Sequence, residues 1–459
     1  MASSLVAVGQ ESRPRRSGPW KIEANPMQGI WSKMRSKAGA SCANCGTSSC
    51  SDVSGPALLP ALVSHFGRNY LSALASASDF PVALKKFPAR PADLRASARS
   101  SRSASPARQP CLAALGAAPA ALPSQDEVAR LLAQVAAGNA DSAAVVLQMS
   151  AQGAAEAELL ISHGATASLT RALESGSSGG GTTRLAAMAV AASLNLCLLN
   201  ERAAPRFSEE GLVMLLVNIL RRVEPSASTS FPLLADVSAL LYCLLHSEAR
   251  VHVAASAGTD VLLWQILVAS SSSAAPPNAD AAPRASARAA AALALLRLSQ
   301  VREVAAQLVD RNAVAQISAM LLAGQANGQV DGQVELSALL ASLTRSEEGV
   351  MALCTVDDAA GARALLQLLQ PAPEQQGKAL SLQQQFGVVI LRNVIASGSA
   401  FGQHLVHAGV CEGLEQLLTA MTGDVKGKKK MGDAAGSPCQ ADKDVCKVQA
   451  LLASLRSCS

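Results

Sequence analysis

The stretch SHGATASLTRAL, residues 162–173, contains a pattern that repeats along most of the chain. Its Gly164 is followed five and nine residues later by Leu169 and Leu173. Residues four apart lie on the same face of a helix, so the pair predicts a helix that begins after the glycine and buries one side. We call the residue in the place of Gly164 the origin of a repeat.

The same spacing recurs five more times. The later origins and the residues five and nine positions after them are Gly211 (Leu216, Leu220), Gly258 (Leu263, Leu267), Asn312 (Ile317, Leu321), Ala360 (Leu365, Leu369) and Gly409 (Leu414, Leu418). A weaker earlier copy has Val128 and Leu132 after Pro123. The origins follow one another at intervals close to the period of known helical repeats, which indicates a helical solenoid. Gly and Asn suit a corner between two helices because they adopt left-handed backbone conformations at small cost.

A second apolar segment with helical spacing lies between each origin helix and the next origin. These segments cover residues 183–200, 233–247, 285–300, 333–345 and 382–397. A short helical stretch then leads to the following origin. Each repeat is therefore expected to contain two long helices and a short one.

Two stretches resemble the armadillo repeat family. AASLNLCLLNERAAPRFSEEGLVMLLVNILRR (residues 191–222) and VVILRNVIASGSAFGQHLVHAGVCEGLEQLL (388–418) are similar to its third helix, short first helix and second helix in succession. The resemblance covers residues 124–421. It implies an all-α, right-handed α-solenoid of about six to seven armadillo-like repeats, which we place at residues 121–423. The two-helix HEAT repeat shares much of the pattern and is an alternative.

Residues 1–120 are expected to form a disordered extension, because a segment rich in Ser, Ala, Arg and Pro cannot bury enough apolar surface to fold. Lys and Arg exceed Asp and Glu by ten in residues 1–110. We expect a solvated basic extension on a cytoplasmic protein. The alternative is an organelle transit peptide, which the segment resembles and which would direct the protein to a plastid or mitochondrion.

Three cysteines in this extension, Cys42, Cys45 and Cys50, have the spacing C-x₂-C-x₄-C. Such a group could hold part of a zinc site, but no second pair follows at a standard spacing. We predict no bound metal or other cofactor, and metal binding by these three thiols is left open.

The end of the chain is expected to contain a Lys/Gly linker, residues 424–441, and a helix, residues 442–457. The helix has apolar residues at helical spacing and is expected to cap the open end of the repeat array, as solenoids require for solubility.

Composition excludes several classes of function. No apolar run long enough to span a bilayer lacks charge, so a membrane span is not expected. Residues 111–459 carry a net charge of −5, which argues against nucleic acid as a partner, since tracking a phosphate backbone needs aligned Lys and Arg. The chain has no glycine-rich phosphate loop, G-x-S-x-G elbow or H-E-x-x-H motif. We therefore expect neither an enzyme nor a site for a small-molecule substrate.

The armadillo resemblance implies a partner-binding row of Asn on the third helices, where a carboxamide offers both a donor and an acceptor to a peptide backbone. Asn195 and Asn393, which precede the origins Gly211 and Gly409 by the same count, match this Asn. The same count back from the other origins gives Tyr242, Leu296 with the polar Arg297 beside it, and Thr344. The broken row argues against a groove that reads a long basic peptide. An alternative role for the two asparagines is hydrogen bonding between neighbouring helices.

The sequence thus predicts a non-enzymatic protein-interaction scaffold or adaptor that uses the concave surface of an armadillo-type array. A nucleic-acid-binding helical-repeat protein and a structural subunit of a cytoskeletal or ciliary assembly are the alternatives. The candidate partner-binding residues are Asn195, Tyr242, Arg297, Thr344 and Asn393.

Overall fold

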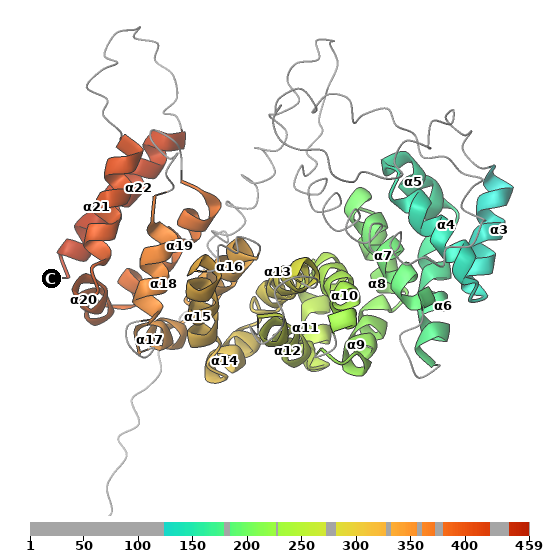
Figure 1. Ribbon diagram of the computed structural model, residues 1–459, viewed down its shortest axis with the longest axis horizontal. Coiled ribbons are helices and arrows are strands. Elements are labelled where there is room, and N and C mark those ends of the chain that lie inside the picture. Colours follow the sequence, from blue (N-terminus) through green and yellow to red (C-terminus); the bar gives the residue numbers. More distant parts are fainter. Residues whose placement is uncertain are drawn as a thin grey trace, which may run out of the picture. The chain divides into compact units, whose positions relative to one another are not determined.

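The computed structural model describes residues 124–178, 184–225, 228–271, 281–326, 332–355, 360–371, 380–422 and 440–458. These residues form twenty α-helices and one short 3₁₀ helix, with no strand among them (Figure 1). The expected all-α solenoid is confirmed. The basic extension with Cys42, Cys45 and Cys50, and nearly all of the Lys/Gly linker, lie outside the described residues.

The helices follow one another in sets of three, a short first helix, a second helix after the origin and a third helix. An incomplete set opens the array with α3 (Gln125–Ala136) and α4 (Ala140–Ser150). The complete sets are α5 (Ala154–Ser162), α6 (Ala165–Ser178) and α7 (Arg184–Leu199); α8 (Ala203–Glu209), α9 (Leu212–Arg222) and α10 (Phe231–Leu244); α11 (Glu248–Ser256), α12 (Thr259–Ser271) and α13 (Ala281–Leu298); α14 (Arg302–Asp310), α15 (Ala313–Ala326) and α16 (Gln333–Leu343); α17 (Glu347–Thr355), α18 (Ala360–Leu369) and α19 (Leu382–Ser397); and α20 (Ser399–His407), α21 (Val410–Thr422) and α22 (Gln440–Arg456). The 3₁₀ helix, Ser228–Ser230, leads into α10.

Five of the six origins form corners between first and second helices, and the sixth, Ala360, is the first residue of α18. Gly164, Gly211, Gly258 and Gly409 have φ angles of 83°, 79°, 73° and 84°. Asn312, at 62°, takes the same left-handed conformation and is the one residue other than glycine with positive φ in the described part of the chain. Gly and Asn recur at these positions because they tolerate the left-handed backbone conformation better than other residues.

The paired apolar residues after the origins form the core. Eleven of the twelve predicted positions are buried, and so are Val128 and Leu132 in the weaker copy. Leu418 is the exception and is half-buried. It lies on α21, which packs against α18 and α22.

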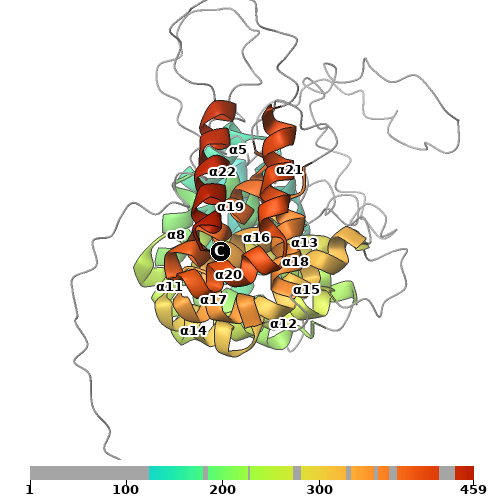
Figure 2. The same ribbon diagram turned by 90° about the vertical axis from the view of Figure 1, so that its left-hand side faces the viewer.

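The three kinds of helix form separate rows. The third helices contact one another in the order α4, α7, α10, α13, α16, α19 and α22. Viewed from the α22 end, the first helices α8, α11, α14, α17 and α20 lie on the left, and the second helices α12, α15, α18 and α21 on the right (Figure 2). The third helices thus form one continuous layer built from segments that are far apart in the chain.

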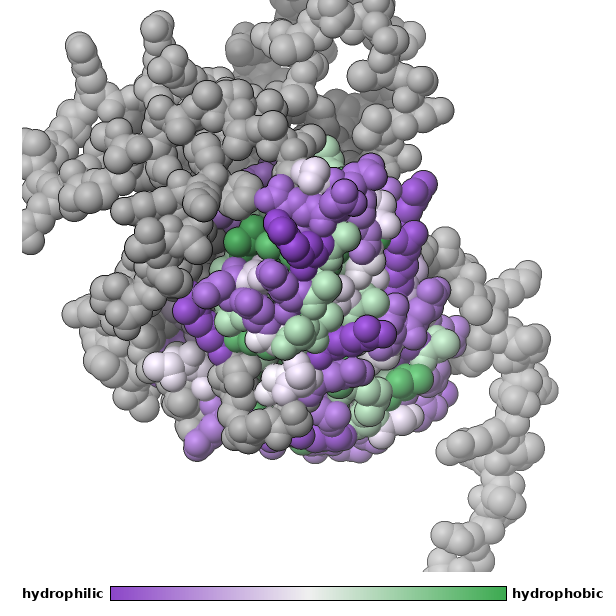
Figure 3. All heavy atoms as spheres, turned by 90° about the vertical axis from the view of Figure 1, so that its right-hand side faces the viewer, coloured by the Kyte–Doolittle hydropathy of each residue, from purple (hydrophilic) through white to green (hydrophobic). Residues whose placement is uncertain are grey.

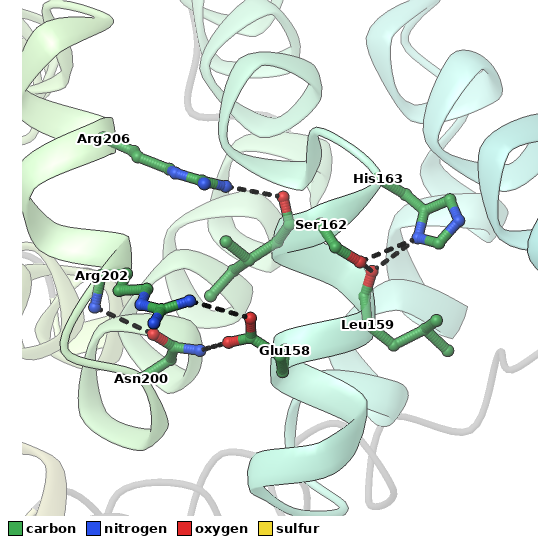
Figure 4. A network of polar contacts seen from close by, with 8 residues as sticks. Glu158, Leu159, Ser162, His163, Asn200, Arg202 and Arg206 are labelled. Carbon is green, nitrogen blue, oxygen red and sulfur yellow. Dashed lines mark hydrogen bonds and ion pairs between the residues drawn. The ribbon is translucent and has the colours of Figure 1, made fainter.

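Polar contacts join first helices of successive repeats. Arg206 on α8 donates to the carbonyl oxygen of Ile161 on α5 at 3.1 Å (Figure 4). One repeat later, Arg250 on α11 donates to the carbonyl oxygen of Pro205 on α8 at 3.4 Å. Beside the first of these, Glu158 accepts from Asn200 and pairs with Arg202. The arginine side chains thus connect the first helices of successive repeats through backbone carbonyl groups.

The two end helices of the described array have polar outer sides. In α3, Val128, Leu132 and Val135 are buried and most other residues are exposed. The molecular face on this side is largely hydrophilic, with hydrophobic residues scattered between (Figure 3). At the other end, α22 packs on α19 and α21, which is the place of the third helix in its repeat. The helix expected to cap the array is thus also its last repeating element.

Among the described helices, no single one combines the length and apolar character needed to cross a membrane. The pair α11 and α12 passes the same test of length and composition only when joined across a bend of 77°.

Candidate protein-binding face

The residues predicted to bind a partner all lie in the row of third helices. Asn195 is on α7, Tyr242 on α10, Arg297 on α13 and Asn393 on α19, and Thr344 directly follows α16. We call the layer formed by α7, α10, α13, α16 and α19 the third-helix face. The fixed count back from each origin therefore leads to the same row of helices, and Arg297 is one residue beyond the counted position, Leu296.

Two helices of this face, α7 and α16, are buried on nearly every side. Twelve of the sixteen residues of α7 are buried, and nine of the eleven residues of α16. A helix at the surface of a globular protein normally has a polar side that faces water. The few polar side chains of these helices therefore stand out against an apolar background.

Asn195 is almost fully buried and bonds to the preceding third helix. Its Nδ2 donates to Oγ of Ser150, at the end of α4, over 3.2 Å. Ser150 in turn donates to the carbonyl oxygen of Leu147 at 2.7 Å. This is the hydrogen bond between neighbouring helices that was the alternative interpretation of Asn195.

Asn393 makes the equivalent contact but is half-buried. Its Nδ2 lies 3.3 Å from the carbonyl oxygen of Ala341 and 3.4 Å from Oγ1 of Thr344. The structure thus brings together two of the predicted residues, Asn393 and the fully buried Thr344. Partner binding by Asn195 and Asn393 stays a prediction, and the more exposed Asn393 is the better placed of the two.

Tyr242 and Arg297 also meet. The Arg297 guanidinium lies over the Tyr242 ring, 4.9 Å from the ring centroid, in a cation–π arrangement that joins α10 to α13. Both side chains are half-buried. The Nε atom of Arg297 is buried and has no hydrogen-bond partner among the described residues. Stacking occupies the face of the guanidinium, so its edge remains the part that can donate.

Sequence reasoning missed a second pair of this kind. Arg284, near the start of α13, lies over the ring of Phe231 at the start of α10, 5.1 Å from its centroid. Arg288, one turn further along α13, is 7% exposed. The three arginines of the alanine-rich α13 can be seen in the sequence, but the aromatic partners of Arg284 and Arg297 belong to α10, which is distant in the sequence.

Asp236 on α10 is a buried acid that sequence reasoning also missed. The residue is 4% exposed, and Oδ2 of its carboxyl group has no hydrogen-bond partner among the described residues. Burial raises the pKa of Asp236 from 3.8 to about 8, because desolvation penalises the charged form. The group is therefore mainly protonated at neutral pH.

The cysteines of this face do not have the environment of nucleophiles. Burial raises the pKa of Cys243 to about 12, against an opposing effect of Arg297, and it also raises the pKa of Cys197. Both are free thiols. Because the thiolate is the reactive form, these side chains are inert packing groups at neutral pH.

No group of three or more His, Cys, Asp or Glu in the described segments is arranged to hold a metal ion. The motif of Cys42, Cys45 and Cys50 lies outside these segments.

A scan against protein-family models finds no match to the sequence, and a search of curated proteins finds none either. Solved structures do match. The chain is similar to an engineered protein from a structural genomics consortium, with 18% identity, 72% of this chain and 68% of that chain covered, and a TM-score of 0.52.

A structure from work on a phosphorylation switch in the interaction between cadherin and β-catenin matches with 14% identity and a TM-score of 0.51. The match covers 73% of this chain and only 56% of that chain. A designed armadillo repeat protein matches with 16% identity over 72% of this chain and all of its own length, at a TM-score of 0.33.

At these identities the likeness concerns the fold alone. The fold is that of an armadillo-like helical-repeat protein. Its complete repeats have three helices each, which distinguishes them from the two-helix HEAT alternative.

Proposed function

We propose that the protein is a non-enzymatic scaffold that holds a segment of a partner protein along the third-helix face. The observation that carries this proposal is the continuous row of third helices from α7 to α19, which offers one surface across five repeats. Such a surface suits a long, linear ligand better than a small molecule.

The chemistry of the face supports binding and gives no support to catalysis. Its thiols have raised pKa values, and its buried acid is mainly protonated at neutral pH. The stacked arginine and tyrosine at α10 and α13 belong to the residue types that most often dominate the energy of protein interfaces. One structural neighbour comes from work on a complex between two proteins, cadherin and β-catenin, which is the kind of role proposed here.

The experiment that tests this function is site-specific photo-crosslinking of the full chain in cells. A photoreactive amino acid replaces Arg392, which is exposed on α19. Matched controls carry it at Val253 on α11 and Met351 on α17, which are 51% and 48% exposed on first helices.

We expect a discrete protein adduct, unaffected by nuclease, from position 392 and none from the two control positions. Nuclease-sensitive adducts alone would favour the nucleic-acid alternative. Equal crosslinking from all three positions would show that the third-helix face is not the binding surface.

A further inference from the structure

Charge is unevenly divided between the rows of helices. The helices of the third-helix face carry five arginines and two acids; the arginines are Arg184, Arg284, Arg288, Arg297 and Arg392, and the acids are Asp236 and Glu335. The first helices α5, α8, α11, α14 and α17 show the opposite balance, with three arginines and eight acids, namely Glu156, Glu158, Glu209, Glu248, Glu303, Asp310, Glu347 and Glu348. The face is thus basic within a repeat region that is acidic as a whole.

One of the two acids, Asp236, is buried and mainly protonated at neutral pH, so it adds little negative charge to these five helices. Two of the arginines, Arg184 and Arg392, are exposed near opposite ends of the face.

Arg297 has the geometry of an anchor for a carboxylate. The Tyr242 ring holds its guanidinium plane, which reduces the freedom that would be lost on binding. Its Nε–H is buried without a hydrogen-bond partner among the described residues. A planar guanidinium donates two parallel hydrogen bonds to a carboxylate, and such a bond is strong when the site is shielded from water.

The neighbours of Arg297 besides Tyr242 lie at the end of α10. Burial has the largest effect on the pKa of Cys243 and of His246, and the charge of Arg297 acts to lower the pKa of both groups.

We propose that the segment held on the third-helix face is acidic, and that Arg297, stacked on Tyr242, receives one of its carboxylates. This inference rests on the proposed function and adds the chemistry of the partner. It also gives a physical reason for the broken row of asparagines, because side-chain charge replaces much of the recognition that carboxamides would give to a peptide backbone.

The test uses the full chain and three fluorescent peptides of equal length, in which leucine is combined with glutamate, glutamine or lysine. Binding is measured by fluorescence anisotropy at low and high salt. The variant Arg297→Gln removes the anchor and Arg297→Lys keeps its charge without the planar fork. Arg302→Gln, at an exposed position on first helix α14, removes the same charge from another row.

We expect the glutamate peptide to bind more tightly than the other two, and less tightly at high salt. Arg297→Gln should weaken its binding by about tenfold or more, Arg297→Lys by less, and Arg302→Gln should leave it unchanged. Circular dichroism checks the fold of each variant. If Arg297→Gln does not fold, Arg392→Glu at an exposed site reverses one charge of the face and should weaken the same peptide.

Tighter binding of the lysine or glutamine peptide, binding unaffected by both variants, or no binding of any peptide would overturn the acidic chemistry. None of these results would contradict the proposed function, which is tested separately by crosslinking from position 392.

Discussion

Arg311 donates from Nη1 to Oδ2 of Asp260 over 2.7 Å and so joins the end of α14 to the start of α12 in the preceding repeat. The Asp260 side chain is 3% exposed and that of Arg311 is 35% exposed. The pair links two repeats through their first and second helices and does not involve the third-helix face.

Removal of Arg311 should therefore destabilise the array. Arg311→Ala leaves a buried carboxylate without its partner, which costs about 3 to 5 kcal/mol in a fully buried pair. Because Arg311 is one third exposed and Asp260 lies in the first turn of α12, where the helix dipole favours a negative charge, we expect about 2 kcal/mol. Urea denaturation measures the loss. The double variant Asp260→Asn, Arg311→Gln should recover part of it, and no recovery would argue against a direct pair.

The register of the repeat is tested by Leu263. This side chain is fully buried on α12, and Leu263→Ala should cost roughly 2 to 5 kcal/mol through lost apolar contact and a residual cavity. Val268→Ala on the same helix is the matched control, since Val268 is 39% exposed, and it should change the melting temperature little. Equal effects of the two substitutions would refute the assignment of the buried side of α12.

The left-handed corner at Asn312 gives a prediction about backbone geometry. With φ at 62°, Asn312→Ala should destabilise by about 1 kcal/mol, because alanine lacks the short polar side chain that lets asparagine adopt this conformation. Asn312→Gly should be neutral or stabilising, because glycine has no Cβ. Thermal melts of the two variants provide the comparison. An alanine variant as stable as the glycine variant would mean that this corner is not left-handed.

Asp236 should make stability depend on pH. Its pKa is about 8 in the folded protein and near 3.8 in the unfolded chain, so the unfolded state loses its proton first as pH rises. Stability should therefore fall between about pH 4 and 8, by roughly 1.4 kcal/mol per pH unit at most.

The Asp236→Asn variant cannot ionise and should lack this fall. We expect its advantage in melting temperature over the natural protein to grow as the pH is raised through this range. A difference that stays constant would mean that Asp236 is ionised throughout, with a partner or solvent that stabilises its charge.

Much of the fold could be predicted from the sequence because residues close together in the chain determine the geometry of each repeat. Gly211 and Leu216 are close in the chain, and their spacing alone gives the corner and the buried face that follows it. The fixed count back from each origin likewise identified the row of third helices. Leu418 shows the limit of this reasoning, since it has the same spacing from its origin as the buried residues and is only half-buried.

The contacts of the site were harder to predict because they join distant segments. Asn195 and Asn393 were recognised, but their hydrogen bonds to Ser150 and to Ala341 and Thr344 depend on the packing of neighbouring third helices.

For the charged groups of the face, too, the residues could be found in the sequence but their contacts could not. Arg297 was identified only as a polar neighbour of the expected position, and its place over Tyr242 required the structure. Asp236, a single acid within an apolar helix, was a signal that could have been read from the sequence.

The most direct test of the central claim is hydrogen–deuterium exchange of the full chain with and without the partner captured by crosslinking at position 392. We predict that the partner slows exchange in peptides from α10, α13 and α19, with little change in those from α11, α14 and α17. Protection confined to the first helices, or to residues 1–123, would contradict a binding site on the third-helix face.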